Sequence, residues 1–328
     1  MDTLSASVVI TARNRREETL KAVASALCQD FGELETLVFD DASGDGTSQA
    51  LEKAAPEVRL FALTERKGYI ANRNRGFREA KGDIVFSLDD DAYFSSPDIV
   101  ARVMTIFEND PSVGAVAIPF IEPLNVRSLS SLRSPFRAKA GDELRGYIGC
   151  AHALRKELAL QLGGYRAYFV HQGEERDLCL RLLDAGYRIV YADCAPVVHT
   201  VSPRREAMRV NFYGARNLIL FDWLNLPWPN LIVRLIWDPV AILRYRFTWR
   251  AVPGRLRAIG AGFIEAARRY RERKPVSPRT YARYRRLPGH GPQEWNGPAP
   301  TPCKAPKQEP TAPGPGIHAG RVGIRATE

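Results

Sequence analysis

Three consecutive carboxylates, Asp89, Asp90 and Asp91, follow the apolar run from Ile84 to Leu88. Adjacent carboxylates repel one another, and at the end of a buried strand they also lose hydration, so such a triplet usually has a cation beside it. Asp89 and Asp91 project to the same side of an extended segment, while Asp90 points the other way. Carboxylate oxygens suit Mg²⁺ or Mn²⁺, whose remaining ligands are water and substrate phosphates. The triplet therefore predicts a metal site for a nucleotide diphosphate. The structural alternative is an acidic turn that caps the next helix.

Around this triplet, apolar strand-like runs alternate with helical patterns. Strands are predicted at residues 7–11, 34–39, 58–63, 84–88, 113–118 and 187–192. Helices are predicted at residues 47–54, 71–80, 97–107 and 151–162, with two more containing Leu20 to Leu27 and Glu174 to Leu183. The alternation predicts an α/β fold with a mostly parallel, doubly wound sheet. Because ligands gather at the carboxyl ends of such strands, Asp40-Asp41 and the triplet both lie at the expected ligand-binding edge.

The second half of the chain differs in charge and pattern. Of the 328 residues, those beyond residue 200 carry the excess positive charge behind the net charge of +10. We divide the chain into an α/β domain (1–203), a basic, aromatic-rich helical extension (204–287) and a Pro/Gly-rich disordered tail (288–328). Arginines interleaved with aromatic residues suit the headgroup layer of an anionic membrane. The alternatives are nucleic-acid binding, which we do not expect to be specific, and arginines whose stems merely cover the first domain.

Three features favour a cytoplasmic protein, peripheral on the inner face of the membrane. The N-terminus lacks a basic region followed by an apolar one, so no signal peptide is predicted. The apolar stretch 224–243 is interrupted by prolines and charges, which makes it a poor transmembrane span. The five cysteines lack paired spacing, which favours a reducing compartment and argues against disulfides or a zinc site.

Residues 125–146 are polar and without periodicity, so they are a candidate mobile loop.

Five motifs, in this order, resemble those of glycosyltransferase family 2, whose members are inverting enzymes of the Rossmann-like GT-A fold that use nucleotide-sugar donors. The motifs are Val8 to Arg15, Asp40 to Thr47, Arg73-Asn74-Arg75-Gly76, the Asp89-Asp90-Asp91 triplet, and Gly163-Gly164-Tyr165 with Gly173 to Leu178. Each is weak alone. Together they span residues 5 to 200 with suitable spacing, and they favour a metal at the triplet over a capping turn.

The resemblance implies a set of nucleotide-binding residues: Thr11, Ala12, Arg13, Asp40, Asp41, Arg73, Asp89 and Asp90. A carboxylate can accept a hydrogen bond from the N3–H of uracil or thymine, which suits a pyrimidine donor. The alternatives are an Asx-type turn at Asp40-Asp41 and a surface partner for Glu79 or Asp83 at Arg73.

The resemblance also implies that Asp91 and Asp89 hold Mn²⁺ or Mg²⁺, which acts as a Lewis acid on the departing diphosphate. His199 follows the last predicted strand and is a candidate additional ligand. The alternative for His199 is an ordinary core or surface histidine.

Inversion by direct displacement requires a carboxylate that takes the proton of the acceptor hydroxyl. In the family this is commonly an Asp after a Glu, whereas this chain has Glu175 at that position, one methylene longer. Position favours Glu175, and Glu174 is the alternative base, although both carboxylates also suit a helix N-terminus. On the acceptor side, the small residues Gly149 and Cys150 permit close approach of a sugar. Trp223 is a further acceptor-side candidate that could stack on a sugar, with core packing as its alternative.

These residues predict a metal-dependent, inverting glycosyltransferase that moves a sugar from a UDP- or dTDP-sugar to a glycan or lipid-linked acceptor. The first alternative is a non-catalytic, nucleotide-binding scaffold whose basic extension binds partners or membrane. The second is a nucleotidyltransferase, for which the segment from Thr11 to Arg16 has the basic residues but lacks the usual glycines.

Overall fold

The structure, a computed structural model, describes residues 4–123, 138–200, 207–245, 247–293 and 299–302. Its centre is a seven-stranded sheet with the order β3-β2-β1-β4-β8-β6-β9. The strands are β1 (Ala6–Ala12), β2 (Leu34–Asp40), β3 (Arg59–Ala62), β4 (Ile84–Asp89), β6 (Val113–Ala117), β8 (His152–Arg155) and β9 (Arg188–Tyr191). β8 runs antiparallel to both of its neighbours, and the other strands are parallel to one another. The predicted mostly parallel α/β sheet is therefore confirmed.

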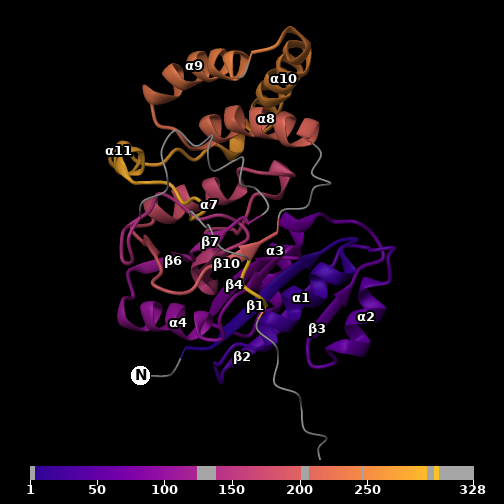
Figure 1. Cartoon of the computed structure of the whole chain (residues 1–328). Helices are drawn as coiled ribbons and strands as arrows, with labels where there is room; N and C mark the ends of the chain where they lie inside the picture. Colours follow the sequence, from indigo (N-terminus) through magenta and orange to yellow (C-terminus); the bar gives the residue numbers. More distant parts are fainter. Residues whose placement is uncertain (1–3, 124–137, 201–206, 246, 294–298, 303–328) are drawn as a thin grey trace, which may run out of the picture.

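Helices cover both faces of this sheet (Figure 1). The helices of the first domain are α1 (Arg16–Leu27), α2 (Thr47–Ala54), α3 (Tyr69–Glu79), α4 (Ile99–Asn109), α6 (Lys156–Gln161) and α7 (Glu174–Asp184). Alternate residues of β1 point to opposite faces. Val8 and Ile10 join one apolar cluster with α1, α2 and α4, and Val9 joins the other with α3, α6 and α7. This two-sided burial is what a doubly wound sheet requires.

The prediction of a single helix over residues 151–162 is wrong. Residues His152–Arg155 form β8, and the helix that follows is the short α6, Lys156–Gln161. β8 fills the place between β4 and β6 and pairs with both of them. Pairing along both edges of a buried strand outweighs the helix propensity of its alanine and leucine.

A small second sheet, not predicted from the sequence, brings distant segments together beside the triplet. Its strands are β5 (Ala92–Phe94), β10 (Val197–His199) and β7 (Phe120–Ile121), in the order β5-β10-β7. In the antiparallel pairing of β10 with β5, His199 lies opposite Ala92. His199 is therefore placed next to the residue that follows Asp91.

The extension is helical, as predicted, and forms a layer at one end of the molecule beyond α7 (Figure 1). Its helices are α8 (Ala207–Asn225), α9 (Asn230–Arg244), α10 (Val252–Arg268) and α11 (Pro278–Arg286). Short 3₁₀ helices occur at Ala167–Phe169, Trp249–Ala251 and Tyr270–Glu272. Within the described residues, no helix combines the length and the apolar composition needed to cross a membrane.

The tail predicted to be disordered from Pro288 begins with a segment that packs on the first domain. Arg145 N donates to Pro288 O at 2.9 Å, and Gln293 N donates to Phe120 O at 2.8 Å. The prediction of disorder therefore does not hold for residues 288–293. Residues 294–298 and 303–328 of this tail lie outside the described residues, as do residues 125–137 of the predicted loop and residues 201–206 at the predicted boundary.

The prediction that the chain has no disulfides also has to be corrected. Cys28 is disulfide-bonded, so the prediction of a chain without disulfides is wrong at this position. Cys150, Cys179 and Cys194 are free thiols. The spacing of cysteines in the sequence therefore does not support a reducing compartment.

Candidate active site

One large cavity, of about 1960 Å³, lies at the carboxyl ends of β1 and β4 and reaches the helical extension. The register of the sheet sets this edge, because Ala12 pairs with Asp40 on one side and Thr11 pairs with Asp89 on the other. Most of the predicted site residues line the cavity: Thr11, Ala12, Arg13, Asp41, Arg73, Asp89, Asp90, Asp91, Gly149, Cys150, Glu175 and His199. Asp40, Glu174 and Trp223 are predicted site residues that do not line it.

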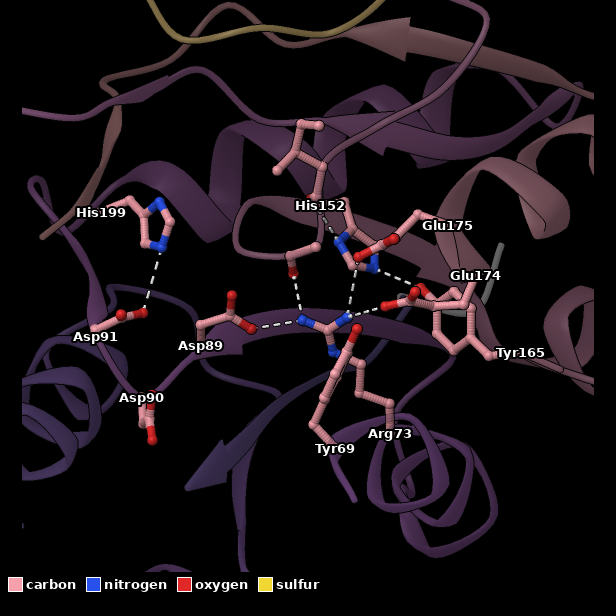
Figure 2. Close-up of polar contacts among 12 residues, drawn as sticks. Tyr69, Arg73, Asp89, Asp90, Asp91, His152, Tyr165, Glu174, Glu175 and His199 are labelled. Atoms are coloured by element: carbon pink, nitrogen blue, oxygen red, sulfur yellow. Dashed lines mark hydrogen bonds and ion pairs between the residues drawn. The ribbon is translucent and has the colours of Figure 1, made fainter. Parts of the chain in front are cut away.

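Asp89, Asp91 and His199 form a cluster whose ligand atoms lie within 4.8 Å of one another. His199 Nε2 is 3.3 Å from Asp91 Oδ1 (Figure 2). His199 Nδ1 is 3.0 Å from Glu122 Oε1. A carboxylate behind a metal-binding histidine fixes the ring and directs its other nitrogen toward the ion. Two carboxylates and one imidazole, with the cavity open beside them, fit Mn²⁺ or Mg²⁺.

The groups around His199 favour its protonated form, so a metal ion would bind the ring by displacing a proton. Burial alone would lower the pKa of His199, but the neighbouring Cys150, Asp91 and Glu122 raise it above its ordinary value. Glu122 was not predicted, because it lies 77 residues before His199 and only the small sheet brings the two together.

Asp90 points away from Asp89 and Asp91 (Figure 2) and holds the loop after β1. Arg13 N donates to its Oδ2 at 3.0 Å, and Arg15 Nη1 donates to its Oδ1 at 2.6 Å. Arg15 also contacts Asp91 at 2.7 Å. Burial, partly offset by the charge of Arg15, raises the pKa of Asp90 to about 7. Arg15, which the sequence prediction missed, is thus the counter-charge of the two carboxylates that follow β4.

Arg73 on α3 links the two halves of the cavity (Figure 2). Its Nη2 is 2.5 Å from Asp89 Oδ1 and donates to Gly149 O at 3.1 Å, and its Nη1 is 3.3 Å from Glu175 Oε1. The side chain is 3% exposed, and its guanidinium lies 5.0 Å from the centre of the Tyr69 ring. Burial opposes the positive charge, but Asp89 and Glu175 raise the pKa of Arg73 well above its usual value. The predicted alternative, a surface partner of Glu79 or Asp83, does not describe this residue.

Glu174 and Glu175 open helix α7, after Gly173 in a left-handed conformation with φ of 92°. Glu175 is 19% exposed and lines the cavity, whereas Glu174 is fully buried, 3.6 Å from Arg73 Nη1. Burial and the charge of Glu175 raise the pKa of Glu174 well above that of an ordinary glutamate. Glu174 is enclosed and Glu175 is accessible, so Glu175 is the carboxylate of this pair that faces the cavity.

Asp40 and Asp41, at the end of β2, mainly accept hydrogen bonds from neighbouring parts of the chain. Asp41 accepts hydrogen bonds from Lys67 N at 2.7 Å, Gly68 N at 3.0 Å and Asn72 Nδ2 at 3.1 Å, and these bonds shape the loop before α3. Asp40 accepts from Ser43 N at 3.0 Å and from the Ser48 hydroxyl. Asp40 therefore forms the Asx-type turn that was its alternative. Asp41 lines the cavity.

Of the three acceptor-side candidates, Gly149 and Cys150 line the cavity and Trp223 does not. A Cβ atom at Gly149 would lie 2.4 Å from Glu175 Oε1 and 2.8 Å from Arg73 Nη2, so the close approach of these groups requires glycine. Cys150 lies beside His199, and burial raises the pKa of its thiol. Trp223 packs within the extension, 5.5 Å from the guanidinium of Arg273, and core packing describes it.

Solved structures with the GT-A fold resemble most of the chain. The mannosyltransferase PcManGT from Pyrobaculum calidifontis, in complex with GDP-Man and Mn²⁺, has a TM-score of 0.56 at 22% identity and covers 86% of this chain and 79% of its own. S. aureus TarS 1–349, in complex with UDP, has a TM-score of 0.59 at 17% identity and covers 80% of this chain and 81% of its own. These similarities show an α/β GT-A fold with C-terminal helices.

Comparison of sequences gives the same family as the motifs predict. Residues 7–168 match the family described as Glycosyl transferase family 2. The glucosyl-dolichyl phosphate glucuronosyltransferase of Haloferax volcanii is 24% identical over 242 residues, which are 67% of this chain and 73% of that protein. The chain belongs to glycosyltransferase family 2 and is a glycosyltransferase.

Proposed function

We propose that this chain is a metal-dependent, inverting glycosyltransferase that takes a sugar from a UDP- or dTDP-sugar. The observation that carries the proposal is the arrangement of the Asp89–Asp91–His199 cluster and Glu175 in one cavity, with Arg73 between them. One end of this cavity suits a nucleoside diphosphate on a divalent ion, and the other presents a carboxylate to an acceptor hydroxyl.

In this proposal, Asp89, Asp91 and His199 would hold Mn²⁺ or Mg²⁺. A bound divalent ion supplies Lewis-acid stabilisation of the charge on the departing diphosphate. Thr11, Ala12, Arg13 and Asp41 form the wall available to the nucleoside. Arg13 also keeps the loop after β1 in place through its backbone bond to Asp90.

Glu175 is the proposed general base. The acceptor oxygen forms a bond to the anomeric carbon as the bond from that carbon to the diphosphate breaks, and Glu175 takes the hydroxyl proton. The negative charge leaves with the nucleoside diphosphate, and the sugar centre inverts because attack comes from the opposite face. Arg73 orients Glu175 and Asp89 relative to each other. The buried Glu174 lies 3.6 Å from Arg73 Nη1 and helps to hold the guanidinium in place.

The proposed acceptor is a glycan or a lipid-linked glycan, and the proposed location is the cytoplasmic face of a membrane. Two observations support a membrane surface as a partner. The extension exposes large apolar side chains, including Trp237 at 64% and Trp249 at 81%, next to arginines. A sequence relative is named for a glucosyl-dolichyl phosphate, which is a lipid-linked sugar.

The test is the release of nucleoside diphosphate from a panel of UDP-, dTDP- and GDP-sugars, with Mn²⁺ and with or without a membrane-lipid extract. We expect one pyrimidine donor to give release that requires both Mn²⁺ and the extract. Nucleotide binding without turnover of any donor would support the non-catalytic scaffold instead, and release of pyrophosphate would support a nucleotidyltransferase.

A further inference from the structure

Helix α9 is apolar on its outer face and charged on its inner face, the reverse of the usual pattern for a surface helix. Five outer side chains at helical spacing are between 40% and 64% exposed: Ile232, Val233, Ile236, Trp237 and Val240. Arg234 and Asp238 lie on the opposite stripe, with Arg234 Nη2 2.9 Å from Asp238 Oδ2. Exposed apolar side chains in such a stripe are suited to an apolar partner.

A groove of about 420 Å³ begins at this stripe, between α9 and α11. Its walls combine the apolar side chains of Val233 and Trp237 with the guanidinium groups of Arg234 and Arg285. Arg234 also lines the active-site cavity. Arg234 is therefore shared by the walls of the groove and of the cavity that contains Glu175.

Two more arginines lie on the cavity wall. Arg176 Nε donates to Tyr284 Oη at 3.0 Å, and the guanidinium of Arg145 lies 5.9 Å from the centre of the Tyr284 ring. Neither Arg145 nor Arg176 forms an ion pair with a carboxylate of the described residues. The guanidinium of Arg176 instead lies 3.9 Å from the centre of the Phe221 ring, on an apolar surface where a charge is poorly solvated.

Two acids near this group of arginines both pair with Arg234. Asp222 is completely buried, and burial together with Asp238 raises its pKa to about 8. Arg234 Nη2 lies 2.9 Å from Asp238 Oδ2, and Arg234 Nε lies 4.0 Å from Asp222 Oδ2. Arg145 and Arg176 have no such ion pair among the described residues, and two guanidinium groups on one cavity wall favour a phosphate.

We propose that the acceptor is a sugar joined through phosphate to a lipid, with its phosphate at Arg145, Arg176 and Arg234 and its hydrocarbon in the α9–α11 groove. This inference rests on the proposed transferase function. Glu175 immediately precedes Arg176 on the first turn of α7, so the acceptor sugar lies between the phosphate and the base. The hydrocarbon continues along the outer stripe of α9 toward the membrane. A free glycan would use neither the groove nor Arg145 and Arg176.

The test is direct binding to the full-length chain by calorimetry, in EDTA so that no divalent ion recruits phosphate to the Asp89–Asp91–His199 cluster. The probes are farnesyl diphosphate, farnesyl monophosphate, pyrophosphate and farnesol, each below its micelle concentration. We expect the two farnesyl phosphates to bind at least about tenfold more tightly than pyrophosphate or farnesol, because the charged and apolar contacts act together. A tenfold preference for the diphosphate assigns a diphosphate linkage, and equal or tighter binding of the monophosphate assigns a single phosphate.

Matched variants separate the two contacts. Arg145 is exposed, so Arg145→Glu should keep the fold, and it should weaken the farnesyl phosphates at least about tenfold while leaving farnesol unchanged. Val233→Ser with Trp237→Ser should weaken the farnesyl phosphates toward the affinity of pyrophosphate. Arg257→Gln, at an exposed arginine on α10 away from the groove, should change nothing.

The inference is overturned if pyrophosphate binds as tightly as farnesyl diphosphate, or if Arg145→Glu and Arg257→Gln are indistinguishable. Because neither donor nor metal is present, a failure of sugar transfer leaves this result unaffected. Conversely, transfer to a water-soluble glycan by a chain that does not bind the farnesyl phosphates would sustain the proposed function and reject the lipid phosphate.

Discussion

Replacing Arg73 with methionine should destabilise the fold and abolish sugar transfer together. Arg73 is almost completely buried, and its guanidinium neutralises Asp89 and Glu175 while it donates to Gly149 O. Methionine is apolar and close to arginine in volume, although shorter, so it fills most of the space but leaves these acceptors without a donor. The carboxylates would then repel one another across the centre of the cavity.

The size of the effect follows from how deeply these partners are buried. Removing one member of a buried ion pair costs about 3–5 kcal/mol, because the remaining charge stays in a poorly solvated place. Asp89 is 31% exposed and Glu175 is 19% exposed, so water can reach part of each carboxylate. We therefore expect the lower end, about 3 kcal/mol, for Arg73→Met. Arg73→Lys keeps the charge but loses the planar fork, so it should cost less, roughly 1–2 kcal/mol.

Urea unfolding followed by circular dichroism measures these differences, and the midpoint should fall in the order wild type, Arg73→Lys, Arg73→Met. Arg78→Met is the matched control, since Arg78 lies exposed on the same helix and should change stability by less than about 0.5 kcal/mol. A stability of Arg73→Met equal to that of Arg78→Met would refute the idea that Arg73 holds the two carboxylates together.

Three further predictions concern the metal cluster, the buried acid pair and Gly149. Glu122→Gln should weaken Mn²⁺ binding about 10–100-fold by releasing the His199 ring, measured by calorimetry; unchanged affinity would exclude Glu122 as the group that orients His199. The pKa of about 8 for folded Asp222 lies above the unfolded value near 3.9, so the stability from this group is fully present below about pH 4 and lost as pH rises through about 8. Asp222→Asn should therefore melt above the wild type at pH 9 and converge with it toward pH 4, and parallel melting curves would contradict the raised pKa. Gly149→Ala should lower transfer activity sharply because its Cβ meets Glu175 and Arg73, and wild-type activity in this variant would show that the two side chains can move apart freely.

Local patterns in the sequence predicted much of the fold. The helix at residues 47–54 has the predicted bounds, and the first, second and fourth strands agree to within one residue at each end. These elements follow one another as strand, helix and parallel strand, so hydrophobic period alone identifies them. β8 breaks that rule because it is an antiparallel strand inserted between two parallel ones, and its pairing partners decide its conformation.

The site could be predicted where motifs place residues at strand ends, and not where tertiary contacts bring distant residues together. Asp89, Asp91 and Glu175 line the cavity as the motifs predict. Arg73 and Glu175 are separated by 102 residues, so no spacing rule reveals their contact. The pairing of His199 with Glu122 depends on a three-stranded sheet whose strands are too short to show a period.

The central claim is that Glu175 takes the acceptor proton and the neighbouring Glu174 only supports Arg73. The most direct measurement compares Glu175→Gln with Glu174→Gln in acceptor-dependent release of nucleoside diphosphate, together with the affinity of each variant for the donor. We expect Glu175→Gln to lower turnover about 10²–10⁴-fold with donor affinity unchanged, as loss of a general base does. Glu174→Gln imitates the neutral form of a buried acid and should keep turnover within about tenfold of wild type. Wild-type turnover in Glu175→Gln, or a larger loss in Glu174→Gln, would contradict this assignment.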